Sequence, residues 1–335
     1  MKGGSAQLLS DQPDTMRGAT SVAHGASPGA PARRPSPRAP RGARAGRLLP
    51  ARAAAPEAAP APASALGPAE RYVATNRFQT KTPEASAAFE KRWATRKSRL
   101  ATLEGFKWFA LLRQVAKDGS GPLDPAGLGE EFNYSSFTVW NDKANFDAWR
   151  KGEAFKEAHG GGTIFGFVDM LVNSAKTLRG PPKPLFYNAT SVASAPYAAA
   201  DLPRITGGWR DVAADGVNLL DTECFAAIKT IYIKAGTEPA FVAATEAMLA
   251  KAEGAAGFRF GALMQPDNEV PAEGELVIAT VSIWDSKTEW EAFLEANRAA
   301  IDERKGEGAG GVEWTKPPVG RHYEGTLLLT TAEGA

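Results

Sequence analysis

The segment TVWNDKANFDAW, Thr138–Trp149, returns without a gap as SIWDSKTEWEAF, Ser282–Phe293. In both copies the first letters read as the end of a strand and the later letters as a helix. Two aligned strand–helix segments indicate an internal duplication better than a chance similarity does. The sequence therefore predicts two copies of one unit, and the flanking elements define that unit.

The elements around the first copy predict a ferredoxin-like order. A strand is expected at 71–80, where alternate residues from Tyr72 to Phe78 share one face. A helix (83–103), two strands (106–115 and 132–140), a helical stretch (143–159) that Gly152 interrupts, a helix (163–178) and a strand (184–192) follow. The order β-α-β-β-α-β is the ferredoxin-like motif.

The same order is expected around the second copy. Strands are predicted at 226–235, 258–264, 275–284 and 322–330, and helices at 238–253 and 287–303. The predicted fold class is therefore α+β, with tandem ferredoxin-like domains after an N-terminal segment. We expect four parts: residues 1–70 disordered, a first domain at 71–195, a linker at 196–223 and a second domain at 224–332.

The first 71 residues contain no Phe, Trp or Tyr but hold 11 of the 24 prolines. Such a composition cannot bury a core, so disorder is expected. Arginines far outnumber acidic residues there, which is typical of an organelle transit peptide. A chloroplast is the first choice, because the prolines break any amphipathic helix, and a mitochondrion is the second. A flexible linker or an interaction tail is the alternative.

Composition excludes several classes of function. The 39 Lys and Arg residues balance the 38 Asp and Glu residues, so nucleic acid is not an expected partner. The single cysteine, Cys224, excludes an intrachain disulfide and a cysteine-rich metal cluster. No apolar run is long enough for a membrane-spanning helix. A small-molecule or protein partner fits better.

His159 and His322 are the two histidines outside the N-terminal segment and thus the candidate metal ligands. Phe155 stands one turn before His159, and glycines at 160–162 would let backbone approach a flat ligand. The alternative is an ordinary, partly exposed histidine. His322, in the last predicted strand, is interpreted as structural.

Other residues stand out near this histidine or in the first strand. Asn76 is unusual because asparagine is depleted in strands, although an edge strand or bulge would also explain it. Trp149 could equally be a core residue. Arg92 and Arg96 are four residues apart beside Trp93, a spacing that suits two carboxylates on one helix face, although most basic runs are merely solvated.

Three stretches resemble the antibiotic-biosynthesis-monooxygenase (ABM) superfamily and, within it, the IsdG-type haem-degrading monooxygenases. They are TNRF (75–78), KRWATRKSRLATLEGF (91–106) and TVWNDKANFDAWRKGEAFKEAH (138–159). The resemblance implies that Asn76, Trp149 and His159 form the active constellation, with His159 as the iron ligand. It also implies that Arg92, Trp93 and Arg96 line the haem pocket or approach the haem propionates, and Phe155, one turn before His159, is expected to give that pocket an apolar wall. The insert at 118–130 and the glycines after His159 depart from the family pattern.

The second copy has other residues at the positions of the three expected active-site residues of the first copy. Phe293 replaces Trp149, Glu303 replaces His159, and Tyr232 or a neighbour replaces Asn76. Neither a glutamate nor a tyrosine reproduces the lost group. We expect an inactive second domain that substitutes for the partner subunit with which this family normally builds a barrel.

The expected activity is oxidative opening of haem b, which is both substrate and cofactor, with O2 and reductant. By resemblance, Asn76 would hydrogen-bond the oxygen ligand and Trp149 would distort the porphyrin. An electron donor such as a ferredoxin or a reductase is an implied partner, and iron is released. The alternatives are a cofactor-independent monooxygenase of quinol-like aromatics and a non-catalytic haem or tetrapyrrole carrier.

Overall fold

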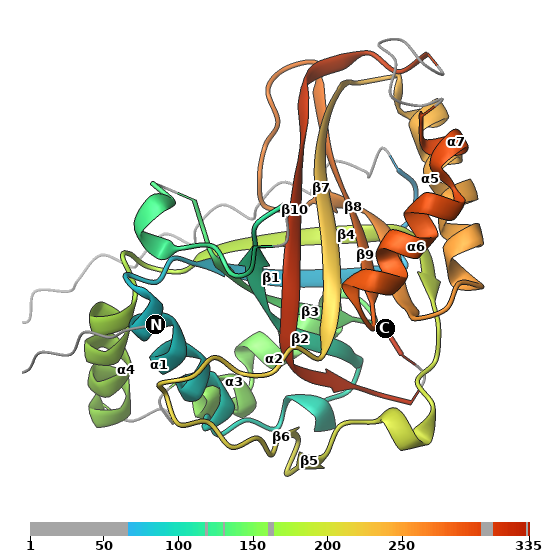
Figure 1. The fold of residues 1–335 in the computed structure, drawn as a ribbon. Helices are drawn as coiled ribbons and strands as arrows, with labels where there is room; N and C mark the ends of the chain where they lie inside the picture. Colours follow the sequence, from blue (N-terminus) through green and yellow to red (C-terminus); the bar gives the residue numbers. More distant parts are fainter. Residues whose placement is uncertain (1–65, 118–119, 130, 160–163, 303–310, 333) are drawn as a thin grey trace, which may run out of the picture. The chain divides into compact units, whose positions relative to one another are not determined.

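Eight strands of the computed structural model close into one barrel, in the order β1-β3-β2-β10-β7-β9-β8-β4 (Figure 1). They are β1 (Arg71–Phe78), β2 (Phe106–Val115), β3 (Tyr134–Trp140), β4 (Lys183–Ser194), β7 (Cys224–Lys234), β8 (Phe258–Pro266), β9 (Glu275–Trp284) and β10 (Trp314–Thr330). The structure describes residues 66–335 except 118–119, 130, 160–163, 303–310 and 333. The expected disorder at 1–70, the glycines at 160–162 and Glu303 therefore lie wholly or almost wholly outside the described residues.

The barrel consists of two four-strand sets with the same order. The first set runs β4-β1-β3-β2 and the second runs β10-β7-β9-β8, so each has its last, first, third and second strand side by side. Two antiparallel seams join the sets, β2 with β10 and β4 with β8. The α+β class and the twice-repeated β-α-β-β-α-β order are thereby confirmed.

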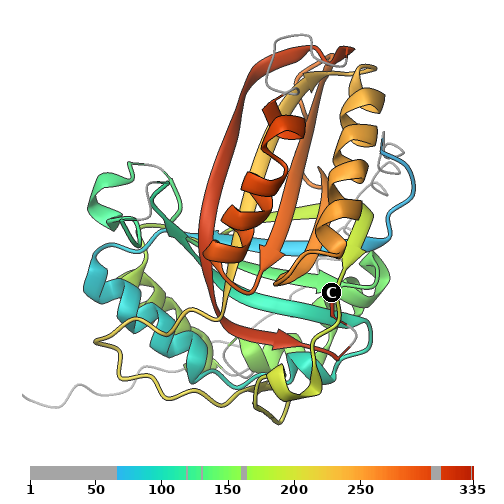
Figure 2. The ribbon, with the colours of Figure 1, turned by 45° about the vertical axis from the view of Figure 1, so that its right-hand side comes forward.

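The helices lie outside the barrel. They are α1 (Pro83–Ala94), α2 (Lys143–Lys151), α3 (Glu153–Ala158), α4 (Ile164–Thr177), α5 (Glu238–Glu253), α6 (Lys287–Ala296) and α7 (Arg298–Asp302). Short 3-10 turns occupy Leu100–Thr102, Pro125–Gly127 and Ala199–Asp201. Helices α5 and α6 lie side by side over the second set (Figure 2), whereas α2 packs on β1 and β3. None of the helices in the described ranges combines the length and apolarity that a membrane span requires.

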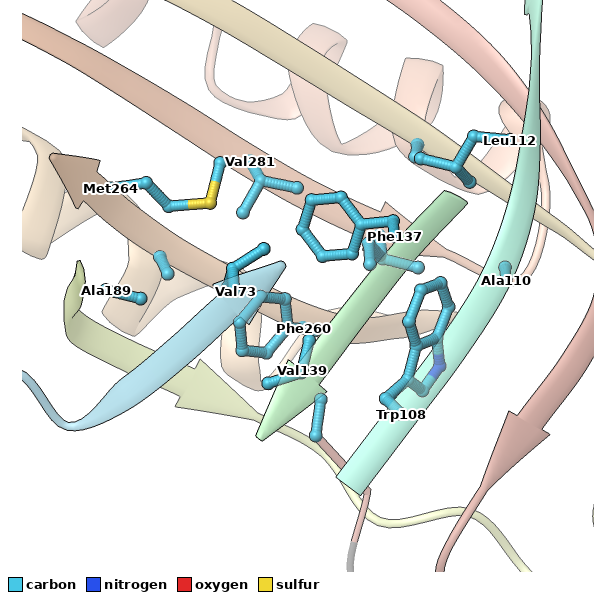
Figure 3. Packing of buried hydrophobic residues seen from close by; sticks show 14 of the residues in the cluster. Val73, Trp108, Ala110, Leu112, Phe137, Val139, Ala189, Phe260, Met264 and Val281 are labelled. Carbon is cyan, nitrogen blue, oxygen red and sulfur yellow. The ribbon is translucent and has the colours of Figure 1, made fainter. Parts of the chain in front are cut away.

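Alternation along the strands creates two cores. Val73 of β1 points into the barrel and joins Trp108, Phe137 and Phe260 in a fully buried cluster (Figure 3). The neighbouring Tyr72 faces the opposite way and joins the cluster between the first set and its helices. A period of two along each strand therefore separates barrel interior from sheet–helix interface.

Two predicted helices are shorter than expected. The first ends at Ala94 rather than 103, because Thr95 leaves the helical conformation (φ −92°, ψ 3°) and the next backbone N–H, that of Arg96, bonds to the carbonyl of Trp93 three residues back. Arg96 therefore lies beyond the helix, and the expected helix face shared with Arg92 is wrong. The helix predicted at 287–303 breaks at Asn297, whose amide donates to the carbonyl of Phe293.

The segment 196–223, predicted as a linker, contains ordered structure. A small hairpin forms from β5 (Ile205–Thr206) and β6 (Trp209–Arg210). Gly208 has a φ of +92°, and a Cβ there would lie 2.7 Å from the Cα of Arg99. Glycine at this turn thus allows the hairpin to approach the chain after α1, and it brings Trp209 into the sheet–helix cluster.

A buried ionic network fixes the end of this segment. Glu90 of α1 is fully buried and accepts hydrogen bonds from Arg113 Nη1 (2.8 Å) and the Tyr134 hydroxyl (2.7 Å). Its second oxygen accepts from the backbone N–H of Leu220 at 2.6 Å. Arg113 also donates to Glu324 of β10 at 2.7 Å. One carboxylate thus holds together a helix, two strands and the segment before β7.

Candidate active site

The predicted site residues gather on the outer, helix-covered side of the first set. Tyr72, Ala74 and Phe78 of β1 form its floor together with Trp140 of β3. Trp93 and Trp149 are partly buried and pack against this cluster from α1 and α2. The site region is therefore an aromatic layer between sheet and helices, on the opposite side of the sheet from the barrel interior.

A chain of aromatic contacts links the sheet to His159. The Trp149 ring lies 5.5 Å from that of Trp140 and meets the Phe155 ring edge-on at 5.1 Å. Phe155 in turn stacks on the His159 imidazole, with centroids 4.0 Å apart. Gly152 caps both α2 and α3, so the predicted interruption of this helical stretch is confirmed. The break turns α3 so that Phe155 meets Trp149.

The hydrogen bond of His159 defines its protonation state. Nδ1 lies 2.7 Å from the carbonyl oxygen of Phe155, and a carbonyl can only accept, so Nδ1 carries the proton. Burial lowers the pKa of His159, and the nearby charge of Arg96 acts in the same direction, against the carbonyl bond that raises it. The ring is therefore neutral at pH 7, and the Nε2 lone pair has no hydrogen-bond partner among the residues that the structure describes. This is the tautomer that a metal ligand requires.

Arg96 is a partly buried cation between two indole rings, with its Nε atom shielded from solvent. Its guanidinium carbon lies 4.5 Å from the Trp93 ring centroid and 4.6 Å from that of Trp209. Burial, with the charge of Arg92, lowers its pKa to about 10, so it stays charged at pH 7. Within the described part of the chain no acid pairs with it, and its Nε has no hydrogen-bond partner. A buried cation without a carboxylate is costly, and an anionic ligand would relieve that cost.

Trp209 was not among the residues predicted for the site. It is 4% exposed, and its indole N–H donates to the carbonyl of Trp93 at 3.0 Å. In the sequence this residue is a lone tryptophan after two glycines in a polar segment. Such a pattern does not show which part of the fold the tryptophan contacts. Arg92 lies in the last turn of α1, and its Nη1 donates to Ser174 Oγ of α4 at 3.3 Å.

Asn76 occupies β1 on the same face as Tyr72 and Phe78, as predicted. Its backbone N–H donates to Ser136 Oγ at 3.2 Å. Among the described residues its amide is hydrogen-bonded to neither Trp149 nor His159. The structure thus joins Trp149, Phe155 and His159 directly, joins Trp93 and Arg96 to each other, and sets Asn76 on the sheet face that they share.

The second set presents different groups at the related positions. Phe293 contacts Trp284 at 5.0 Å, and Tyr232 lies under Lys316 Nζ at 5.1 Å. His322 of β10 is packed between Phe225 and Trp290, and its Nδ1 is buried without a partner among the described residues. Burial also lowers the pKa of His322. These contacts agree with its interpretation as a structural residue.

Residues 71–161 match the family model described as antibiotic biosynthesis monooxygenase. A candidate monooxygenase from Fusobacterium nucleatum subsp. nucleatum has a similar crystal structure, with a TM-score of 0.50 and 8% identity over 80% of this chain and 97% of that one. A candidate monooxygenase from Lactobacillus acidophilus gives 0.49 and 9%, over 78% and 96%. An anthrone oxidase-like protein gives 0.40 and 16%, over 77% and 92%. No curated protein matches the chain.

The family match ends just after His159 and covers β1 to β3 with α1, α2 and α3. The likeness to the Fusobacterium structure extends the shared fold over both four-strand sets. An ABM monooxygenase-like fold is therefore shown, and at this identity the likeness establishes the fold alone.

Proposed function

We propose that this chain binds haem at the outer face of the first set and opens it oxidatively. The observation that carries the proposal is a neutral imidazole near a partly buried guanidinium, and among the described residues no acid pairs with that guanidinium. A haem needs one imidazole nitrogen for its iron and cations for its propionates. The donor set at His159 and Arg96 therefore fits haem.

Haem bound there would supply a redox-active iron for O2 chemistry and, as the substrate, the porphyrin that is opened with release of iron. His159 Nε2 would hold the iron, and the carbonyl of Phe155 fixes the orientation of the imidazole through Nδ1. Trp149 contacts Trp140, Phe146 and Phe155, so it forms a fixed wall against a flat ligand. Such a wall is one means of distorting a macrocycle.

The remaining residues of the site would bind the haem and orient it. Arg96 and Arg92 would receive the propionates, with Trp93 stacked beside Arg96. Asn76 would contribute an amide donor from the sheet side of the site. An external electron donor, such as a ferredoxin or a reductase, would complete the reaction.

We further propose that the second set replaces a partner subunit. Support comes from the two seams, which join two sets of identical strand order as two subunits would be joined. The second set would then act as a scaffold that closes the barrel, because Phe293 and Tyr232 cannot take the roles of Trp149 and Asn76.

Haemin titration of the full chain tests the proposal. Absorbance should show a Soret band that saturates at one haem per chain, and the band should decay when ascorbate is added in air. His159→Ala should abolish saturable binding, whereas the matched control His322→Ala should retain it. Circular dichroism of both variants checks that each is folded.

The other outcomes separate the alternatives. A saturable Soret band that persists unchanged under ascorbate and air would identify a haem or tetrapyrrole carrier. No saturable binding, or binding that His159→Ala leaves intact, would refute the proposal. Turnover of a quinol-like aromatic without haem would then favour a cofactor-independent monooxygenase on the same fold.

A further inference from the structure

A cavity of about 210 Å³ opens inside the barrel, on the other side of the sheet from His159. Thr75 and Arg77 of β1 line it, whereas Asn76 between them belongs to the opposite face. Residues from both four-strand sets contribute to its wall, including Tyr187 of β4 and Tyr323 of β10. It is therefore separate from the proposed haem site.

The polar groups of this cavity are incompletely satisfied. Gln114 is 6% exposed, and its Oε1 has no hydrogen-bond partner among the described residues. The Nε of Arg77 is likewise buried without a partner. A buried amide oxygen without a donor costs free energy, so the cavity favours an occupant with an O–H or N–H group.

Two tyrosines, Tyr187 and Tyr323, line the same cavity. Tyr187 and Tyr323 are 8% and 9% exposed, and burial raises the pKa of both, of Tyr323 to about 12. Both therefore remain protonated and can donate. Arg77 and Arg321 line the same cavity as the two tyrosines, and their charges act to lower these pKa values.

Each of the two arginines has an acidic partner, and Glu131, the partner of Arg321, is itself part of the cavity lining. Arg77 meets Glu269 at 3.3 Å and Arg321 meets Glu131 at 3.7 Å. Both glutamate side chains are more than half exposed, at 51% and 57%, so each pair contributes little. A ligand carboxylate would therefore compete with Glu269 and Glu131, which can turn out into solvent, for the two guanidinium groups.

Apolar side chains share the rest of the wall with the polar side chains of Thr75, Glu131, Ser135 and Thr230. Phe137 and Met264 belong both to the cavity lining and to the packed cluster below it (Figure 3). Leu185 adds a third apolar side chain. The cavity is smaller than a pocket for a drug-sized ligand, which begins at roughly 300 Å³, so its occupant must be compact.

We propose that the barrel interior binds a small carboxylic acid with a flat apolar body and a hydroxyl group. The carboxylate meets Arg77 and Arg321, with the tyrosine hydroxyls as further donors. The ligand hydroxyl donates to Gln114 Oε1, and the ring rests on Phe137 and Met264. Hydroxybenzoates have this combination of groups.

Calorimetric titration of the full chain with 4-hydroxybenzoate, benzoate and phenol tests the assignment. 4-Hydroxybenzoate should bind at one per chain, and each of the other two roughly ten-fold more weakly, since each lacks one charge-assisted or buried hydrogen bond. Arg321→Gln should weaken 4-hydroxybenzoate roughly ten-fold. Gln114→Leu should remove the preference for 4-hydroxybenzoate over benzoate while benzoate still binds.

His159→Ala is the matched control, because it alters the outer site alone and should leave acid binding unchanged. If Arg321→Gln does not fold, Arg77→Gln addresses the same contact. Absence of saturable heat with all three probes would overturn the proposal. Binding that His159→Ala removes but Gln114→Leu and Arg321→Gln leave intact would also overturn it, since the ligand would then lie in the outer site. Haem binding can succeed or fail independently of either result.

Discussion

Replacing Glu90 by glutamine should destabilise the protein far more than a change of one atom suggests. The carboxylate receives three donors, from Arg113, Tyr134 and Leu220, at 2.6 to 2.8 Å and with no solvent exposure. Both carboxylate oxygens accept hydrogen bonds, but a glutamine keeps only one acceptor oxygen. Its NH2 group would therefore face an N–H donor, and that hydrogen bond would be lost. Breaking a buried ion pair costs about 3–5 kcal/mol. Arg113 keeps Glu324 as a partner, so we expect the lower end, about 3 kcal/mol.

Equilibrium unfolding in urea measures this loss, and a thermal melt should show a fall in Tm of about 6 °C, at about 2 °C per kcal/mol for a chain of this size. Glu157→Gln is the matched control, because Glu157 pairs with Arg99 at the surface and should change stability by less than about 0.5 kcal/mol. Amide exchange at Leu220 should also accelerate in Glu90→Gln alone. Equal losses in the two variants would refute the assignment of a structural role to the buried network.

Three further predictions concern other parts of the chain. Trp209→Ala should cost about 3–5 kcal/mol of unfolding free energy in urea, and a loss below about 1 kcal/mol would show that the hairpin is dispensable. Burial places the pKa of His159 and His322 below 6.5 in the folded state. The unfolded chain therefore binds more protons below about pH 6.5, so stability should be complete above that pH and fall beneath it. Unfolding at pH 7.5 and 5.5 should show a smaller fall in the variant with glutamine at both positions, and an unchanged fall would contradict this explanation. Finally, residues 1–70 fused to a fluorescent protein should direct it to the chloroplast in plant cells, and mitochondrial or diffuse signal would reject the plastid assignment.

The sequence predicted the order of elements well, because that order depends on local patterns. The alternating face from Tyr72 to Phe78 and the apolar run at 275–284 read directly as strands. The end of α1 could not be read in the same way, since the pattern continues past Ala94. What stops the helix is the cap at Thr95, together with the insertion of Arg96 between two tryptophans.

The site residues also differ in whether a local sequence pattern suggests them or only the tertiary fold brings them together. His159 and Trp149 were predicted as site residues because their spacing resembles a known pattern. Trp209, the second aromatic partner of Arg96, could not be predicted from the sequence. It lies more than a hundred positions away and contacts Arg96 only in the tertiary fold. Arg77 and Gln114 look like ordinary surface residues in the sequence. Only the closure of the barrel turns them inward.

The two seams of the barrel have a consequence for synthesis on the ribosome. The outer edges of β2 and β4 pair with β10 and β8, which are made later in the chain. Gln114 of β2, for example, is paired only once Tyr323 of β10 has been synthesised. Until the second set has emerged, the first set exposes two unpaired edges with an apolar inner face, which is a template for association between nascent chains. We expect production of soluble protein to depend on how quickly the second set follows, and slow translation after β4 to increase aggregation.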